Sequence, residues 1–140
     1  MQINMPRVWF GGLVAGLTVM VSGAALVPMV GNDMDMALAR LGLPPLSPAA
    51  MAYFVLVSFI VGIVLVWLYA AFIPRLGARI TTALTAAAIV WLIGYLLPNV
   101  AKVFYGFLPV KLTLIGTAWG LIELAAGSLI GSRLYKERRT

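Results

Sequence analysis

The 140-residue chain is 63% hydrophobic and only 10% charged, with a mean hydropathy of +1.05. Soluble domains carry about 25% charged residues, so this composition could hardly cover a surface exposed to water. The chain contains no cysteine and no histidine, which excludes disulfides, thiolate metal sites and histidine-based acid–base chemistry. The net charge of +6 comes from cations in short connections and at the C-terminus, a distribution typical of membrane topology and not of nucleic-acid binding.

Four apolar stretches, each closed by proline or charge, predict four transmembrane helices in a single domain over residues 1–140. Each stretch has about the 20 residues that a helix needs to cross a hydrocarbon core. We expect the spans at about residues 8–30, 48–72, 80–97 and 111–132. The predicted fold is therefore all-α, a polytopic membrane protein whose four helices form a compact bundle.

Proline and polar residues predict where these helices begin and end. The first is expected to end at residues 31–33, the second to begin with Ser47 as its N-cap, and the third to end at Pro98. The two longer connections, residues 33–41 and 104–108, are apolar on one face or aromatic throughout. We expect both connections to lie in the headgroup region of the membrane.

The charge distribution predicts the orientation of the chain. Most of the ten lysines and arginines lie near the termini or in the connection between the second and third helices, so both termini are expected in the cytoplasm of a bacterium, with the spans in its inner membrane. The basic residues of the tail are expected to bind anionic lipid; they are Arg133, Lys136, Arg138 and Arg139. A loose recurrence of residues 26–30 in residues 96–100 leaves open a bundle of two tandem hairpins.

Glu123 is the only charged residue in the interior of a predicted span, since Lys111 stands at the first position of the fourth. It follows Lys111 by 12 residues and therefore lies about 15–18 Å from either end of its helix, at the bilayer midplane. An ionisable group at this depth is a functional candidate, and Trp119, one turn earlier, and Ser58, at similar depth, are further polar candidates. A protonated Glu123 would suit a hydrogen bond that holds helices or subunits together. Passage of protons or cations and binding of a ligand are the alternatives.

Glycines form a stripe on the last helix, on the face that carries Glu123, and a second stripe on the first helix. Small residues at spacings of three and four let helix backbones approach closely. We therefore expect these two helices to pack antiparallel, with Gly12 near Gly131 and Val19 near Glu123. The helix-packing candidates are Gly12, Gly16, Gly23, Gly116, Gly120, Gly127 and Gly131.

The chain offers little that would carry chemistry. Thioethers bind Cu(I), and four methionines cluster on the expected outer side, but methionine is also a common filler of packed interfaces. We expect no metal and no cofactor. A phosphate loop, paired carboxylates and a Ser/Lys dyad are absent from the sequence, so we expect no enzymatic activity.

Several short motifs follow one another along the chain. They are Gly-Gly-Leu-Val-Ala-Gly at 11–16, Leu-Pro-Pro-Leu-Ser at 43–47, Val-Trp-Leu-Tyr-Ala-Ala at 66–71, Tyr-Leu-Leu-Pro at 95–98, and residues 114–123 with Trp119 and Glu123. In this order they resemble a group of small bacterial inner-membrane proteins with four helices. The resemblance implies the same fold and a shared pairing of Trp119 with Glu123. It implies no activity, because none is known for the group.

The function we expect is that of a non-enzymatic inner-membrane protein. It would act through helix contacts, as a homo-oligomer or as an accessory subunit of a larger membrane complex. The first alternative is a small transporter or channel subunit with Glu123 in a proton or cation path. The second is a lipid or quinone binding module with Trp119 and Trp91 beside an apolar groove. A path requires water to reach Glu123, whereas a structural role requires the side chain to be enclosed between helices.

Overall fold

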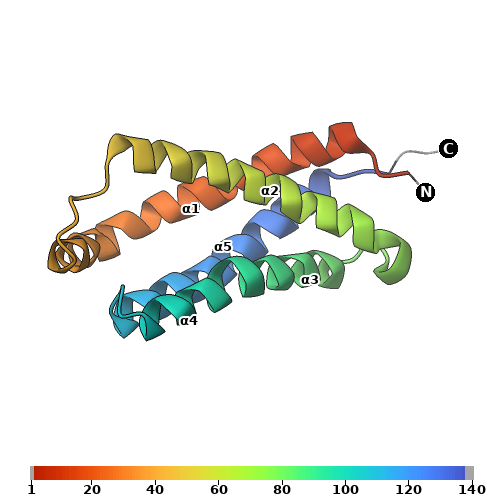
Figure 1. The fold of residues 1–140 in the computed structure, drawn as a ribbon. Coiled ribbons are helices and arrows are strands. Elements are labelled where there is room, and N and C mark those ends of the chain that lie inside the picture. The colour runs from red at the N-terminus through yellow and green to blue at the C-terminus, as the bar shows by residue number, and fades with distance from the viewer. Residues whose placement is uncertain (1, 138–140) are drawn as a thin grey trace.

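A computed structural model of the chain describes residues 2–137 (Figure 1). The elements in order are α1 (Met5–Arg40), α2 (Pro48–Leu76), α3 (Ile80–Trp91), the π-helix η1 (Leu92–Leu96), α4 (Leu97–Phe104) and α5 (Val110–Leu134). The segments α3, η1 and α4 form one continuous helix. Within the described residues, four helices are therefore long and apolar enough to cross a membrane, and they pack against one another. The predicted all-α fold is confirmed.

The contacts among the helices define the cross-section of the bundle. Helices α2 and α5 contact each other, and each also contacts α1 and α3, whereas α1 and α3 do not touch in the part of the chain described. Both termini and the α2–α3 turn lie at one end of the bundle, which we name the termini end (Figure 1). The α1–α2 and α4–α5 connections lie at the other, the loop end. An even number of crossings places both termini on the same side of a membrane.

The start of α2 agrees with the sequence. The Ser47 hydroxyl accepts a hydrogen bond from the Ala50 backbone N–H at 3.2 Å, and Pro48 occupies the first helical position. This N-cap satisfies one of the donors that a helix start leaves unpaired. At the other end of α2, Gly77 has φ +77°, a left-handed conformation that glycine adopts without strain, and this allows the tight turn into α3.

The predicted helix ends at residues 31–33 and at Pro98 are wrong. Helix α1 continues through Pro28 to Arg40, and its last turns are seen nearly end-on in Figure 1 while the rest runs across the view. The helix therefore bends instead of stopping, as proline permits when neighbouring helices support the backbone. Residues 33–40 run across the bundle, the direction expected of a segment in the headgroup region.

Pro98 is accommodated by the π-helix that precedes it. The Leu97 N–H donates to the Leu92 carbonyl, five residues back, so this turn is wider than an α-helical turn. The widening leaves room for the proline ring where it would otherwise press on the carbonyl of Gly94. The helix consequently runs on to Phe104.

The chain ends are held together at the termini end. The Asn4 side-chain amide donates to the Lys136 carbonyl at 3.0 Å, and the Asn4 N–H donates to the Tyr135 hydroxyl at 3.2 Å. The Tyr135 ring meets Tyr69 edge to face at 6.1 Å. The cations Arg7, Arg75, Arg79, Arg133 and Lys136 lie toward this end. Arg138 and Arg139 of the predicted lipid-binding tail lie outside the described residues.

Candidate functional site

Glu123 is enclosed in the middle of the bundle. Glu123 belongs to α5 and is only 4% exposed. The carboxyl Oε1 accepts a hydrogen bond from the Tyr95 hydroxyl of η1 at 2.6 Å. This bond joins the third spanning helix to the fourth at the depth where lipid offers no competing hydrogen-bond partner.

Tyr95 reaches Glu123 because Gly120 leaves space for its ring. A Cβ atom added at Gly120 would lie 2.5 Å from Cε1 and 3.0 Å from Cγ of the tyrosine, closer than carbon atoms can pack. The ring therefore covers the α5 backbone at Gly120, and the hydroxyl extends to the carboxyl three residues further on. π-Helical turns such as η1 occur frequently at functional sites. The Tyr95 side chain is thus directed into the bundle and toward α5.

A second pair of polar side chains lies next to this bond. The Trp119 indole N–H donates to the Ser22 hydroxyl at 3.0 Å and contacts the Ser22 carbonyl at 3.2 Å. The Ser22 hydroxyl in turn lies near the Glu123 carboxyl. We name the four residues Glu123, Tyr95, Ser22 and Trp119 the Glu123 cluster. It connects α1, η1 and α5.

One oxygen of the cluster lacks a partner. Glu123 Oε2 is buried and makes no hydrogen bond to any part of the chain that the structure describes. An ionised carboxylate in such a place is very costly without a cation beside it, and the span residues around it contain no lysine or arginine. A neutral carboxyl group at Glu123 would accept from Tyr95 at Oε1 and leave Oε2 to carry the proton, with the Ser22 hydroxyl nearby. The arrangement can bind one proton and tie three helices together.

Ser58, the other polar candidate, lies apart from this cluster. The residue is only 2% exposed, but its hydroxyl donates to the Phe54 carbonyl of its own helix at 2.8 Å. Such back-bonding satisfies a hydroxyl inside a helix without a second helix. Among the described residues, Ser58 therefore makes its hydrogen bond within α2 and not with Glu123.

The glycines of α1 meet two different helices. A Cβ at Gly12 or Gly16 would lie 2.5 to 2.6 Å from backbone Cα atoms of α2, and Gly62 of α2 packs directly against both of them. The neighbouring Gly11 instead faces Gly131 of α5. Helices α1 and α5 do pack antiparallel. The residue that meets Gly131 is Gly11, one position before the expected Gly12, because α2 occupies the Gly12 face of α1.

The remaining glycine candidates differ in what they face. Gly127 lies against the Ala15 carbonyl of α1, at 3.2 Å from an added Cβ, and Gly23 lies against the Phe54 ring of α2. Nothing lies within 4 Å of a Cβ added at Gly116, so the stripe on α5 ends before this residue. The sequence did not single out Gly62, because an isolated glycine in a span has no periodic neighbour to mark it.

Further polar contacts extend from the loop end toward the cluster. The Asn99 amide donates to the Thr117 hydroxyl at 2.8 Å, and Lys102 donates to the Asn99 carbonyl oxygen at 3.1 Å. The Trp91 indole donates to the Thr117 backbone carbonyl, also at 2.8 Å. Both tryptophans assigned to a possible apolar groove thus donate to a neighbouring helix. We name the row Lys102, Asn99 and Thr117 the polar seam.

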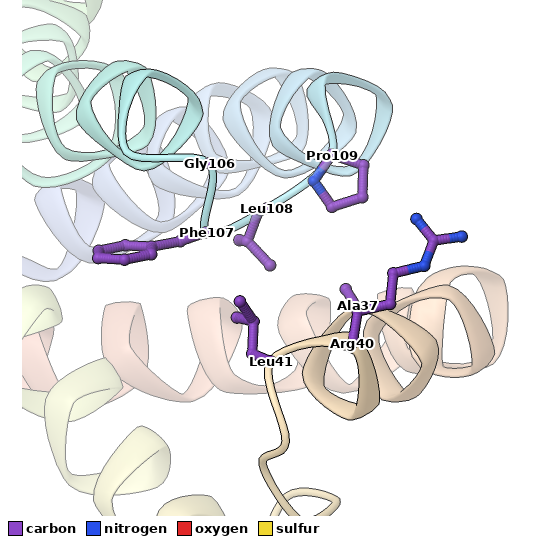
Figure 2. A pocket seen from close by; sticks show the side chains of 7 residues that line it. All are labelled: Ala37, Arg40, Leu41, Gly106, Phe107, Leu108 and Pro109. Carbon is purple, nitrogen blue, oxygen red and sulfur yellow. The ribbon is translucent and has the colours of Figure 1, made fainter.

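A pocket of about 240 Å³ lies at the loop end, between the end of α1 and the α4–α5 connection (Figure 2). Leu41 and Leu108 point into it, and the Arg40 side chain extends along its rim. Close to this end, Lys111 and Asp33 form an exposed ion pair at 3.7 Å. The residues that line the pocket are Ala37, Arg40, Leu41, Gly106, Phe107, Leu108 and Pro109. They do not include any member of the Glu123 cluster.

Comparison with known proteins adds no family to this picture. No protein-family model matches the chain, and searches of curated proteins and of solved structures find no match. The resemblance to small four-helix inner-membrane proteins therefore stays a prediction. The functional argument depends on the geometry of the helices and of the Glu123 cluster.

Proposed function

We propose that this chain is a non-enzymatic integral membrane protein that acts through helix contacts within the membrane. It works as a homo-oligomer or as an accessory subunit of a larger membrane complex. In this proposal the spans lie in the inner membrane of a bacterium with both termini in the cytoplasm, where Arg133 and Lys136 meet anionic lipid headgroups. The observation that carries the proposal is a row of exposed small residues on α3.

The outward face of α3 carries a row of small residues, beside the exposed side chains of Ile80 and Leu84. Thr81, Thr85 and Ala88 are exposed and share one face at spacings of four and three. The Thr85 hydroxyl donates to the Thr81 carbonyl at 2.8 Å, so this hydroxyl is satisfied within the helix and needs no other partner. Small residues at this spacing let another helix approach closely, which favours association in lipid.

The opposite face of α3 is already used inside the bundle. Thr82, Ala83, Ala86 and Ala87 are buried there against α2 and α5. By contrast, the outward face of α2 carries bulky side chains, among them Ile60, which is 50% exposed. Bulky flexible side chains suit contact with lipid, whereas the small face of α3 suits contact with a helix. The burial of Glu123 supports the same interpretation, because its carboxyl group is bonded within the chain, to Tyr95.

Cysteine cross-linking tests the proposal, since the chain has no cysteine of its own. We expect Ala88→Cys to form a disulfide-linked dimer, or one defined adduct with a partner subunit, when native membranes are oxidised. Ile60→Cys, also exposed and well inside its span, is the matched control and should stay monomeric. The two adducts are distinguished by mass, because a homodimer has twice the mass of the chain.

Two results would contradict the proposal. In the first, Ala88→Cys stays monomeric under oxidation although a small thiol reagent labels it in the same membranes. In the second, Ala88→Cys and Ile60→Cys cross-link equally, which indicates random collision in lipid instead of a specific helix contact.

A further inference from the structure

The polar seam leads from the loop end to the Glu123 cluster. Lys102 contacts Asn99, and Asn99 contacts Thr117 across the interface between α4 and α5. Tyr95 precedes Asn99 by four residues, and Glu123 follows Thr117 by six, so the Tyr95–Glu123 bond lies one to two helical turns deeper along the same interface. The polar seam thus runs from a cation at the rim to Thr117, one to two turns short of the carboxyl in the middle of the bundle.

Open space accompanies this seam. Gly116 and Gly120 are four residues apart and share a face of α5. The Tyr95 ring fills the space over Gly120, whereas no atom of another described helix lies within 4 Å of a Cβ added at Gly116, one turn nearer the loop end. The α5 surface is therefore uncovered beside Thr117 and covered beside Glu123.

Toward the termini end, the surroundings of Glu123 are apolar and closely packed. Val19, Leu65, Ala87 and Leu124 form a cluster in which no residue is more than 2% exposed. The next polar side chain of α5 in this direction is Ser128, whose hydroxyl is already bonded to the Ala83 carbonyl of α3 at 2.7 Å. Along α5, the next hydroxyl toward the termini end is therefore already bonded, whereas the polar seam lies toward the loop end.

We propose that Glu123 is a proton-binding site that exchanges its proton with the loop end alone, along the polar seam. The proton resides on Oε2, the oxygen without a partner, while Tyr95 holds Oε1. The groups that face the carboxyl are Tyr95 of η1 and Ser22 of α1; α2 brings no charged side chain to this depth, and Lys102 stands at the far end of the seam. The site goes beyond the proposed function because it needs no partner subunit.

Hydrogen–deuterium exchange of the Glu123 carboxylic acid tests this inference. Infrared spectra of the protein in liposomes at neutral pH should contain the C=O band of a protonated carboxyl group, and Glu123→Gln should remove that band. In D₂O the band should shift as Oε2–H becomes Oε2–D. We expect Thr117→Val, which removes one step of the seam, and Gly116→Leu, which fills the open space, each to slow this shift by about tenfold.

The control is Ser128→Ala, which removes a hydroxyl on the termini side of Glu123 and should leave the exchange rate unchanged. Unchanged helical circular dichroism would show that each variant keeps the fold. If Gly116→Leu does not keep the fold, the exchange rate of Thr117→Val decides the outcome. The proposal is overturned if the parent lacks the protonated band, if the band does not exchange, or if Ser128→Ala slows exchange as much as Thr117→Val.

Discussion

Replacement of Gly62 by alanine probes the closest helix crossing in the bundle, where α2 meets α1. An added Cβ would lie 2.5 Å from the Gly16 Cα and closer still to the Gly16 nitrogen and the Gly12 carbonyl oxygen. Carbon atoms pack at about 3.5–4.0 Å, so the two helices must separate by about 1 Å or more. The atoms concerned belong to the backbone and cannot turn away.

The expected cost follows from two opposing effects. Alanine favours a helix over glycine by about 0.5–1 kcal/mol. Forcing an extra carbon into packed backbone costs about 1–3 kcal/mol, and a gap of about 1 Å forfeits up to half of the local dispersion energy. The packing cost less the helix preference leaves a net effect, and we expect Gly62→Ala to lower the free energy of unfolding by about 0.5–2.5 kcal/mol.

The assay is unfolding by detergent titration in mixed micelles, followed by circular dichroism. Gly116→Ala makes the same chemical change on α5, where nothing lies within 4 Å of the new atom, and it should be neutral or stabilising by up to about 1 kcal/mol. If Gly62→Ala unfolds at the same detergent fraction as the parent, or later than Gly116→Ala, the close α1–α2 crossing does not exist and the reasoning fails.

Three further predictions concern the Glu123 cluster, the packing of Tyr95 against Gly120, and the topology. Glu123→Gln keeps a donor and an acceptor and should retain stability, whereas Glu123→Leu leaves the buried Tyr95 hydroxyl unpaired and should cost about 1–2 kcal/mol in the same titration; equal stability of the Leu variant would contradict the bond. Gly120→Leu should disrupt the fold more than Leu121→Ala, because it displaces the Tyr95 ring, and identical gel-filtration profiles in mild detergent would count against this. Reporter fusions after residues 35, 77 and 140 should report outside, inside and inside, and a periplasmic C-terminus would refute the predicted orientation.

The four helices could be predicted from the sequence because lipid imposes one simple requirement. A chain in hydrocarbon must satisfy every backbone polar group internally, so a long apolar stretch without charge has little choice but to be helical. Ser47 could be predicted as a cap for another local reason, because its hydroxyl bonds the backbone of the helix that it begins. It failed at Pro28 and Pro98, because the bend of α1 and the π-helical turn that accommodate these prolines are not visible in composition.

The site was predicted only in part. Glu123 stood out because a carboxyl group inside an apolar span is costly wherever its helix packs. Its partner could not be found in the same way, since Tyr95 is a common interfacial residue and its direction depends on the width of η1 and on the absence of a side chain at Gly120. Gly120 lies on a different helix from Tyr95, so the pattern within a single span does not reveal their contact.

The sequence by itself determined which segments are long and apolar enough to cross a membrane and which residue is an acid within them. It also indicated faces whose residues are small enough to let helices approach closely. Only the tertiary structure decided which surfaces meet. A glycine permits close approach on its side of a helix but does not specify the partner, so Gly12 and Gly16 could face α5 or α2 until the packing of Gly62 settled the choice. Hydrophobicity sets the number of helices because it is a sum over residues, whereas contacts such as Tyr95–Glu123 depend on the relative position of two helices, which no single segment encodes.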